Sequence, residues 1–209
     1  MDMQLECTRS LCLDLDLASG RKIRLRPIVP SDDEHIANGI RAMSERSRYL
    51  RFFSGFRTAP PGLAAKLADV DGYRHIGWGV ISLSASHAPP IAAAHAIRKS
   101  EYDQEGEFAI AVLEAYQREG IAYLLIAVIF ELCRLQGWKS LTVDVLQENR
   151  SALRLFKMLG AVCYESAGPV ASYRIDIAGA LSALRAIDNK HFLNDVIESV
   201  SDISAASVH

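Results

Sequence analysis

The most informative segment of the chain begins Glu107-Phe108-Ala109-Ile110-Ala111-Val112-Leu113 and continues with Gln117-Arg118-Glu119-Gly120-Ile121-Ala122. The first part has the composition of a buried strand. Apolar residues at helical spacing follow from Ile121, which predicts a helix over residues 120–136 that ends at Gly137. A strand that runs through a short loop into a helix aims several unpaired backbone N–H groups at one point. With the positive end of the helix dipole, these groups predict a binding site for an anion such as a phosphate.

Three residues of the loop support this interpretation. Gly120 has no side chain and lets a ligand approach the backbone closely, and the small Ala122 leaves the start of the helix uncrowded. Arg118 can add a charge-assisted hydrogen bond to a phosphate. The alternative for Arg118 and Glu119 is that they are only the exposed start of a helix.

The rest of the chain alternates between strands and helices. Residues 11–17 and 22–26 predict a hairpin whose acidic strand faces a basic one, and a capping box at Ser31-Asp32-Asp33-Glu34 predicts a helix up to Met43. Further helices are predicted at 44–53, 60–70 and 150–159, and strands at 75–84, 91–99, 107–113, 140–146, 162–165 and 171–177. We therefore expect one α/β domain over residues 11–177, then a helical appendage to about Val200 and a flexible tail up to residue 209.

The composition limits the classes of protein to which the chain can belong. The chain has 209 residues, 50% of them hydrophobic, and a formal net charge of −2, which fits a single globular domain and argues against a nucleic-acid partner. The apolar run from Ile121 to Phe130 is too short to span a membrane, and the N-terminus lacks the basic start of a signal peptide. We expect a cytoplasmic protein without a metal, because the six histidines form no metal pattern and the cysteines show no metal-ligand or CxxC spacing: Cys7, Cys12, Cys133 and Cys163.

The loop resembles the pyrophosphate loop of the GNAT superfamily of N-acetyltransferases, whose pattern is Gln/Arg-x-x-Gly-x-Gly/Ala. Gln117, Gly120 and Ala122 fill its three specified positions, and Asn149, after the next strand, matches the family's cofactor-binding asparagine. The resemblance covers about residues 22–176. It implies a mixed, mostly antiparallel sheet with helices on both faces, splayed where acetyl-CoA binds. It also implies the cofactor-binding residues: Val112, Leu113, Gln117, Arg118, Glu119, Gly120, Ile121, Ala122 and Asn149. Asn149 can also cap the following helix, and the two roles are compatible.

A narrower resemblance concerns the acceptor. Leu25-Arg26-Pro27, the segment 47–54 and Glu107-Phe108-Ala109 resemble the catalytic domain of bacterial Pat-type protein-lysine acetyltransferases. This implies transfer of an acetyl group to a protein lysine, with a small-molecule amine as the close second. Two other classes stay open: a non-catalytic module that binds acyl-CoA, and an interaction protein that dimerises through its C-terminal segment. A homo-oligomer is also left open.

The chemistry needs a base, since a lysine with a pKa near 10.4 is neutral in only about one molecule in a few thousand at pH 7. By the resemblance, Glu107 matches the catalytic glutamate of Pat-type enzymes, and Glu105, two residues earlier on the same face, is the runner-up. The alternative for Glu107 is a solvated carboxylate at the end of a strand. The resemblance also implies that the backbone N–H of Val112 or Leu113 stabilises the oxyanion.

One departure from the family leaves the general acid unassigned. Many members carry a tyrosine in the helix after Asn149, but this chain has Phe156 there, as Pat-type domains often do. Cys163 and Tyr164 lie nearby in the sequence, and we expect both in the core. Residues 49–53 border the acceptor site in the family, and the alternative is that they only pack an amphipathic helix on the sheet.

Overall fold

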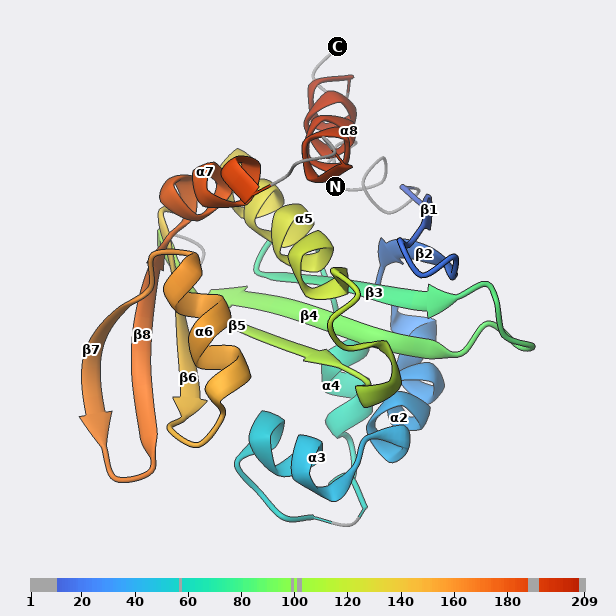
Figure 1. Cartoon of the computed structure of the whole chain (residues 1–209), viewed down its shortest axis with the longest axis horizontal. Helices are drawn as coiled ribbons and strands as arrows, with labels where there is room; N and C mark the ends of the chain where they lie inside the picture. The colour runs from blue at the N-terminus through green and yellow to red at the C-terminus, as the bar shows by residue number, and fades with distance from the viewer. Residues whose placement is uncertain (1–10, 57, 99, 101–102, 188–191, 207–209) are drawn as a thin grey trace.

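One eight-stranded sheet forms the centre of the computed structural model, which describes residues 11–56, 58–98, 100, 103–187 and 192–206 (Figure 1). The strands lie in the order β1-β2-β3-β4-β5-β6-β8-β7, and all neighbours are antiparallel except β5 and β6, which are parallel. This confirms the expected mixed, mostly antiparallel sheet. The bounds are β1 (Leu13–Asp16), β2 (Lys22–Pro27), β3 (His75–Ser82), β4 (Pro90–Arg98), β5 (Glu105–Val112), β6 (Ser140–Leu146), β7 (Val162–Ala167) and β8 (Val170–Asp176).

Helices cover both faces of the sheet, as expected. On one face lie α2 (Asp33–Ala42), α3 (Glu45–Phe52) and α4 (Leu63–Ala68), and on the other lie α5 (Ile121–Leu135), α6 (Arg150–Met158), α7 (Ile177–Ile187) and α8 (Phe192–Ala206) (Figure 1). Two short 3-10 helices, η1 (Pro30–Asp32) and η2 (Glu114–Tyr116), complete the set in the described part of the chain. No helix among these residues is long and apolar enough to cross a membrane.

The N-terminal hairpin forms with the expected pairing of charges. Asp14 lies opposite Arg24 and Asp16 opposite Lys22, and their side chains form ion pairs of 2.6 and 2.8 Å. Because both pairs are exposed, they add little to stability and mainly fix the register of the strands.

The core is built around α5, and the C-terminal helices pack directly on it. Eleven of the fifteen residues of α5 are buried, and Leu193, Val196, Ile197 and Val200 of α8 are buried against the same cluster. Glu131 of α5 is fully buried, and its carboxylate accepts hydrogen bonds from Arg134 at 2.7 and 2.8 Å and from Ser201 of α8 at 2.6 Å. A buried carboxylate is tolerated only when it is paired in this way. α8 also runs to Ala206, past the expected end near Val200.

Three local expectations are wrong. The capping box predicted at Ser31–Glu34 does not form at the start of α2, because the carboxylate of Asp32 binds Arg26 through two hydrogen bonds of 2.6 Å and accepts the Val29 N–H at the start of η1 at 2.9 Å. Tyr164 and Cys163 are exposed on β7, the edge strand, and are not in the core. The residues behind the predictions for Cys7, for the N-terminal start and for the last three residues of the tail lie outside the described part of the chain.

The separation of β5 from β6 places the site. The two strands pair only at Glu105–Ser140, Gly106–Leu141 and Glu107–Thr142, although β5 continues to Val112 and β6 to Leu146. Gly106 lies at the closed end, where a Cβ atom would come within 2.4 Å of the Trp138 ring. The lack of a side chain therefore lets Trp138 pack against the last paired residues. Beyond Glu107 the sheet opens, which confirms the expected splay.

Candidate active site

A cleft of about 960 Å³ lies where the two strands diverge. Its walls come from β5, from the loop that precedes α5, from α3 and from the start of α6. Eight of the ten residues predicted from the sequence line it: Glu107, Val112, Gln117, Arg118, Gly120, Ile121, Ala122 and Asn149. The two exceptions are Leu113, which lines an adjacent pocket, and Glu119.

The loop before α5 presents a row of free backbone donors. Gln117 N–H is used by η2, and hydrogen bonds resume with Tyr123, but no backbone N–H from Arg118 to Ala122 donates to any described residue. Arg118 and Gly120 have positive φ values of 65° and 86°, a conformation that turns successive N–H groups toward one point. Because these donors lie at the N-terminus of α5, the loop has the geometry of a phosphate site.

Two side chains of the loop tie it to neighbouring parts of the fold. Gln117 donates from Nε2 to the carbonyl of Val112 at 3.0 Å, which ties the loop to β5. The carboxylate of Glu119 pairs with Arg21 and accepts from Ser19 Oγ at 2.8 Å, so it is held by the N-terminal hairpin. Glu119 therefore offers the cleft its backbone N–H and not its side chain.

The two backbone donors expected to stabilise the oxyanion are not equivalent. The N–H of Leu113 donates to the carbonyl of Ile91 at 2.9 Å and is not free. Hydrogen bonds alternate in direction along an antiparallel strand, so the N–H groups of Val112 and Ile110 point away from β4 and into the opening beside β5. This corrects the expectation for Leu113 and leaves Val112, with Ile110 as a donor that the sequence did not single out.

Asn149 caps α6 at the cleft. Its side chain accepts from the N–H of Ala152 at 3.2 Å, which confirms the expected cap and leaves the amide NH₂ free to bind a ligand. Arg150 and Arg154, which the sequence reasoning missed, follow on α6 and line the same cleft as Arg118. Arg150 and Arg154 are four residues apart and so share one face of the helix, which is the sequence pattern that could have identified them.

Glu107 is the last residue of β5 that pairs with β6, so its carboxylate lies at the closed end of the cleft. It is exposed, and no hydrogen bond or ion pair to another described residue engages it. Glu105, the runner-up, is held by Arg174, whose Nε lies 2.7 Å from Oε1. Of the two carboxylates, Glu107 is the one available to a ligand.

Helix α3 closes the opposite wall and brings Arg51 near Glu107. Ser44 and Ser47 at its start both donate to Glu114, which anchors the helix to the end of β5. Burial lowers the pKa of Arg51 to about 10, and the negative charge of Glu107 works in the opposite direction. Arg51 and Phe53 line the cleft and Phe52 an adjacent pocket, whereas no residue of α3 is fully buried. The helix thus forms a wall and is not simply packed on the sheet.

Phe156 forms part of the cleft floor. Its ring is buried and packs edge-on against Phe108 with centroids 6.4 Å apart. It has no proton to give, so the structure leaves the general acid unassigned. Among the described residues, no group of three or more His, Cys, Asp or Glu side chains is arranged to hold a metal ion.

A sheet that separates beside an anion-binding loop, with a free carboxylate at the closed end, defines an acyl-CoA-dependent transferase fold. Residues 42–161, more than half of the chain, match the acetyltransferase (GNAT) family, and the chain belongs to this family. The chain is 25% identical over 190 residues to the acetyltransferase Pat of Mycolicibacterium smegmatis, covering 91% of the chain and 54% of that protein. It therefore spans about half the length of this curated relative.

Solved structures share the fold. The GNAT domain of S. lividans PAT superposes with a TM-score of 0.69 at 23% identity, over 79% of this chain and 96% of that one. A cAMP-binding acyltransferase from Mycobacterium smegmatis superposes with a TM-score of 0.62 at 19% identity, over 98% of this chain and 60% of that one. Members of the family are acyltransferases that take an acetyl group from acetyl-CoA.

Proposed function

We propose that this chain transfers the acetyl group of acetyl-CoA to an amine, with Glu107 as the general base and a protein lysine as the acceptor. The observation that carries the proposal is the position of Glu107. It is an unpaired carboxylate at the closed end of the cleft, on the same strand as the free N–H groups of Ile110 and Val112.

The backbone groups of the cleft supply binding and charge stabilisation. The free donors from Arg118 to Ala122 bind the pyrophosphate of the substrate, since both its charge and its size suit a helix N-terminus. The N–H of Val112 or Ile110 then donates to the thioester oxygen, and this hydrogen bond strengthens as the oxygen becomes negative in the transition state.

The transfer needs no covalent enzyme intermediate. Glu107 accepts a proton from the ammonium or the attacking amine, and the nitrogen lone pair forms a C–N bond to the thioester carbon. The C–S bond then breaks and CoA leaves as a thiolate.

The choice of a protein lysine over a small amine is supported by the likeness to the acetyltransferase Pat. It is also supported by the exposure of the site. On the face of the sheet that carries Glu107, Asp144 of β6 and Arg174 of β8 are exposed, and so is Phe53, which directly follows α3 and lines the cleft.

The test of the base is Glu107→Gln, with Glu105→Gln as a matched control on the same strand face. We expect the Glu107 variant to lose roughly 10²-fold or more in kcat while its affinity for acetyl-CoA stays within about twofold, because only proton transfer is removed. The Glu105 variant should keep most of its activity. Steady-state rates over a panel of lysine peptides, proteins and small amines measure both variants and the acceptor preference.

Two results would contradict the proposal. Full activity of Glu107→Gln would remove Glu107 as the base. Saturable binding of acetyl-CoA by the wild type with no turnover on any acceptor would instead favour a non-catalytic acyl-CoA-binding module.

A further inference from the structure

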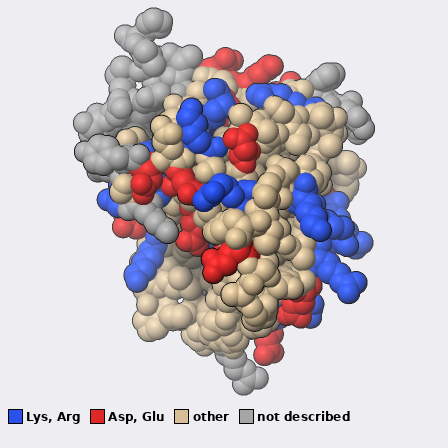
Figure 2. Space-filling model, turned by 90° about the vertical axis from the view of Figure 1, so that its left-hand side faces the viewer, with Lys and Arg blue, Asp and Glu red and all other residues tan. Residues whose placement is uncertain are grey.

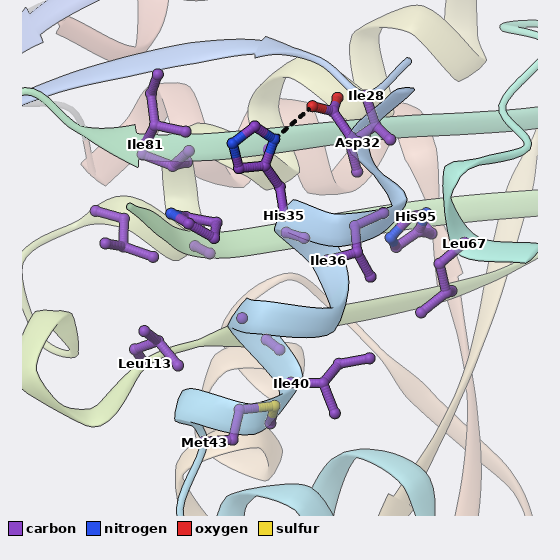
Figure 3. A pocket seen from close by; sticks show the side chains of 18 of the residues that line it. Ile28, Asp32, His35, Ile36, Ile40, Met43, Leu67, Ile81, His95 and Leu113 are labelled. Atoms are coloured by element: carbon purple, nitrogen blue, oxygen red, sulfur yellow. Dashed lines mark hydrogen bonds and ion pairs between the residues drawn. The ribbon is translucent and has the colours of Figure 1, made fainter. Parts of the chain in front are cut away.

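A second cavity, of about 90 Å³, lies between α2 and the sheet and has no part in the function proposed above. In Figure 3, Ile36 and Ile40 project from α2, Leu67 enters from α4, and Ile81 and Leu113 approach from the strand side. The floor is made of small residues, among them Gly79, Ala93 and Ala111. The lining is therefore mostly apolar.

This cavity, called the α2 pocket below, adjoins the cleft. Met43, Arg51 and Ala111 line both spaces. Ala111 lies four residues after Glu107 on the same face of β5, because side chains alternate along a strand. Its neighbours Ile110 and Val112 carry the backbone donors of the cleft. A thioester held by those donors would have its acyl group beside Ala111, at the mouth of the α2 pocket.

Most polar side chains that line the α2 pocket already interact with another side chain. Arg26 binds Asp32 through two hydrogen bonds of 2.6 Å, and His35 Nδ1 lies 3.2 Å from the same carboxylate. His95 Nδ1 lies 3.0 Å from His75 Nε2, and Arg51 interacts electrostatically with Glu107. The remaining surface favours a hydrocarbon chain over a charged group.

We propose that the α2 pocket receives the hydrocarbon tail of acyl groups longer than acetyl, so that the enzyme is a short-chain acyltransferase. This rests on the proposed function, and the reaction is unchanged: the acyl C–N bond forms as the C–S bond breaks. An apolar cavity of roughly 150 Å³ holds a benzene ring, so a cavity of about 90 Å³ has room for about three methylenes beyond acetyl. Propionyl to pentanoyl groups would fit, and much longer ones would not.

The first test measures kcat/KM for a series of acyl-CoA donors with one acceptor. Burial of a methylene contributes about 0.8 kcal/mol, which corresponds to a roughly fourfold gain in kcat/KM for each carbon up to pentanoyl. We expect a fall from octanoyl onward, and succinyl-CoA to be a poor donor. An optimum at acetyl, or a flat series, would overturn the proposal. A preference for succinyl-CoA would overturn it in favour of a carboxylate bound by Arg51.

A second test needs no acceptor. Unreactive CoA thioethers with ethyl to octyl chains are titrated calorimetrically against the whole chain. Affinity should rise to butyl or pentyl and then fall. Equal affinity across the series would overturn this inference alone, whereas no binding of any CoA compound would overturn the proposed function itself.

Two variants change the size of the α2 pocket in opposite directions. They distinguish an effect of pocket size on the preferred chain length from a uniform loss of activity. Ala93→Val fills the floor and should move the preferred chain toward acetyl. Ile36→Ala removes three carbons from the opposite wall and should move it toward hexanoyl. A uniform loss with all donors, and no shift of the optimum in either variant, would contradict the assignment of this pocket.

Discussion

The buried side chain of His95 makes the stability of the protein depend on pH. Its ring on β4 is almost completely buried, and its Nδ1 lies 3.0 Å from Nε2 of His75. His75 Nδ1 lies 2.9 Å from the carbonyl of Asp69, and a carbonyl can only accept, so His75 donates there. A neutral His75 must then accept at Nε2, and His95 must donate to it. The pair is therefore held in a single arrangement of protons.

This arrangement requires a neutral His75, because a protonated ring would carry a hydrogen on Nε2 and could not accept there. Burial lowers the pKa of His95 well below its usual value, and the proximity of His75 and the positive charge of Arg51 lower it further. Burial also lowers the pKa of His75, although the Asp69 carbonyl and the charge of Asp71 oppose this. The folded protein thus takes up protons here less readily than the unfolded chain does.

We expect the free energy of unfolding to fall as the pH drops below about 6.5, where histidines of the unfolded chain bind protons. The stability is fully present above this pH. Below it, the limiting slope for His95 is about 1.4 kcal/mol per pH unit until the pKa of the folded state is reached. The buried carboxylates add a separate loss nearer pH 4, since the pKa values of Asp32 and Glu131 are also lowered.

Urea unfolding at pH 5.5 and 7.5 measures this effect. His95→Gln keeps a hydrogen-bond donor but does not titrate, so the difference between the two pH values should shrink in the variant. Equal stability of the wild type at both pH values would show that the histidine pair is not held neutral.

At the scale of elements, α6 carries the cationic side of the cleft. Arg118, Arg150 and Arg154 line the cleft, and no hydrogen bond or ion pair within the described residues engages their side chains. Basic side chains also gather along the right-hand edge of the face shown in Figure 2. Three unpaired cations suit the additional phosphate that CoA carries beside its pyrophosphate.

We expect the double variant Arg150→Ala/Arg154→Ala to bind acetyl-CoA at least about tenfold more weakly, the loss of about 1.4 kcal/mol. Its affinity for acetyl-dephospho-CoA, which lacks the 3′-phosphate, should change less than about threefold. Lys157→Ala is the matched control, because Lys157 is exposed on the same helix but does not line the cleft. Equal losses for both nucleotides would show that the arginines do not recognise this phosphate.

Periodicity and local motifs predicted most elements within about two residues, because α5, β6 and α6 obey strong patterns of their own. What the sequence could not predict depends on contacts between distant segments. The partner of Glu119 is Arg21 in the N-terminal hairpin, and the partner of the Leu113 N–H is Ile91 on β4. Likewise, Glu131 is satisfied by Ser201, seventy residues later. Each of these contacts joins segments that are distant in the sequence, and no pattern in the sequence near either residue predicts it.

At the scale of the whole molecule, the cleft divides the sheet into two parts. Strands β1 to β5 form one part and β6, β8 and β7 the other, and only three residue pairs of β5 and β6 join them. Helix α5 lies against β3, β4 and β5, and it contacts α7, which follows β8. A ligand in the cleft therefore touches both parts, through the α5 loop on one side and Asn149 with α6 on the other.

Binding of CoA should therefore stabilise the protein as a unit. A ligand at one hundred times its Kd contributes about 2.7 kcal/mol, which for a chain of this size raises the melting temperature by roughly 5–11 °C.

Gly120→Tyr should abolish the shift, since its φ of 86° disfavours a side chain and the ring would stand in the cleft. Differential scanning fluorimetry with and without CoA measures both proteins. An unchanged melting temperature of the wild type in excess CoA would contradict the proposed function and favour an interaction protein, because a cleft that bridges two parts of the sheet cannot bind its ligand without stabilising both.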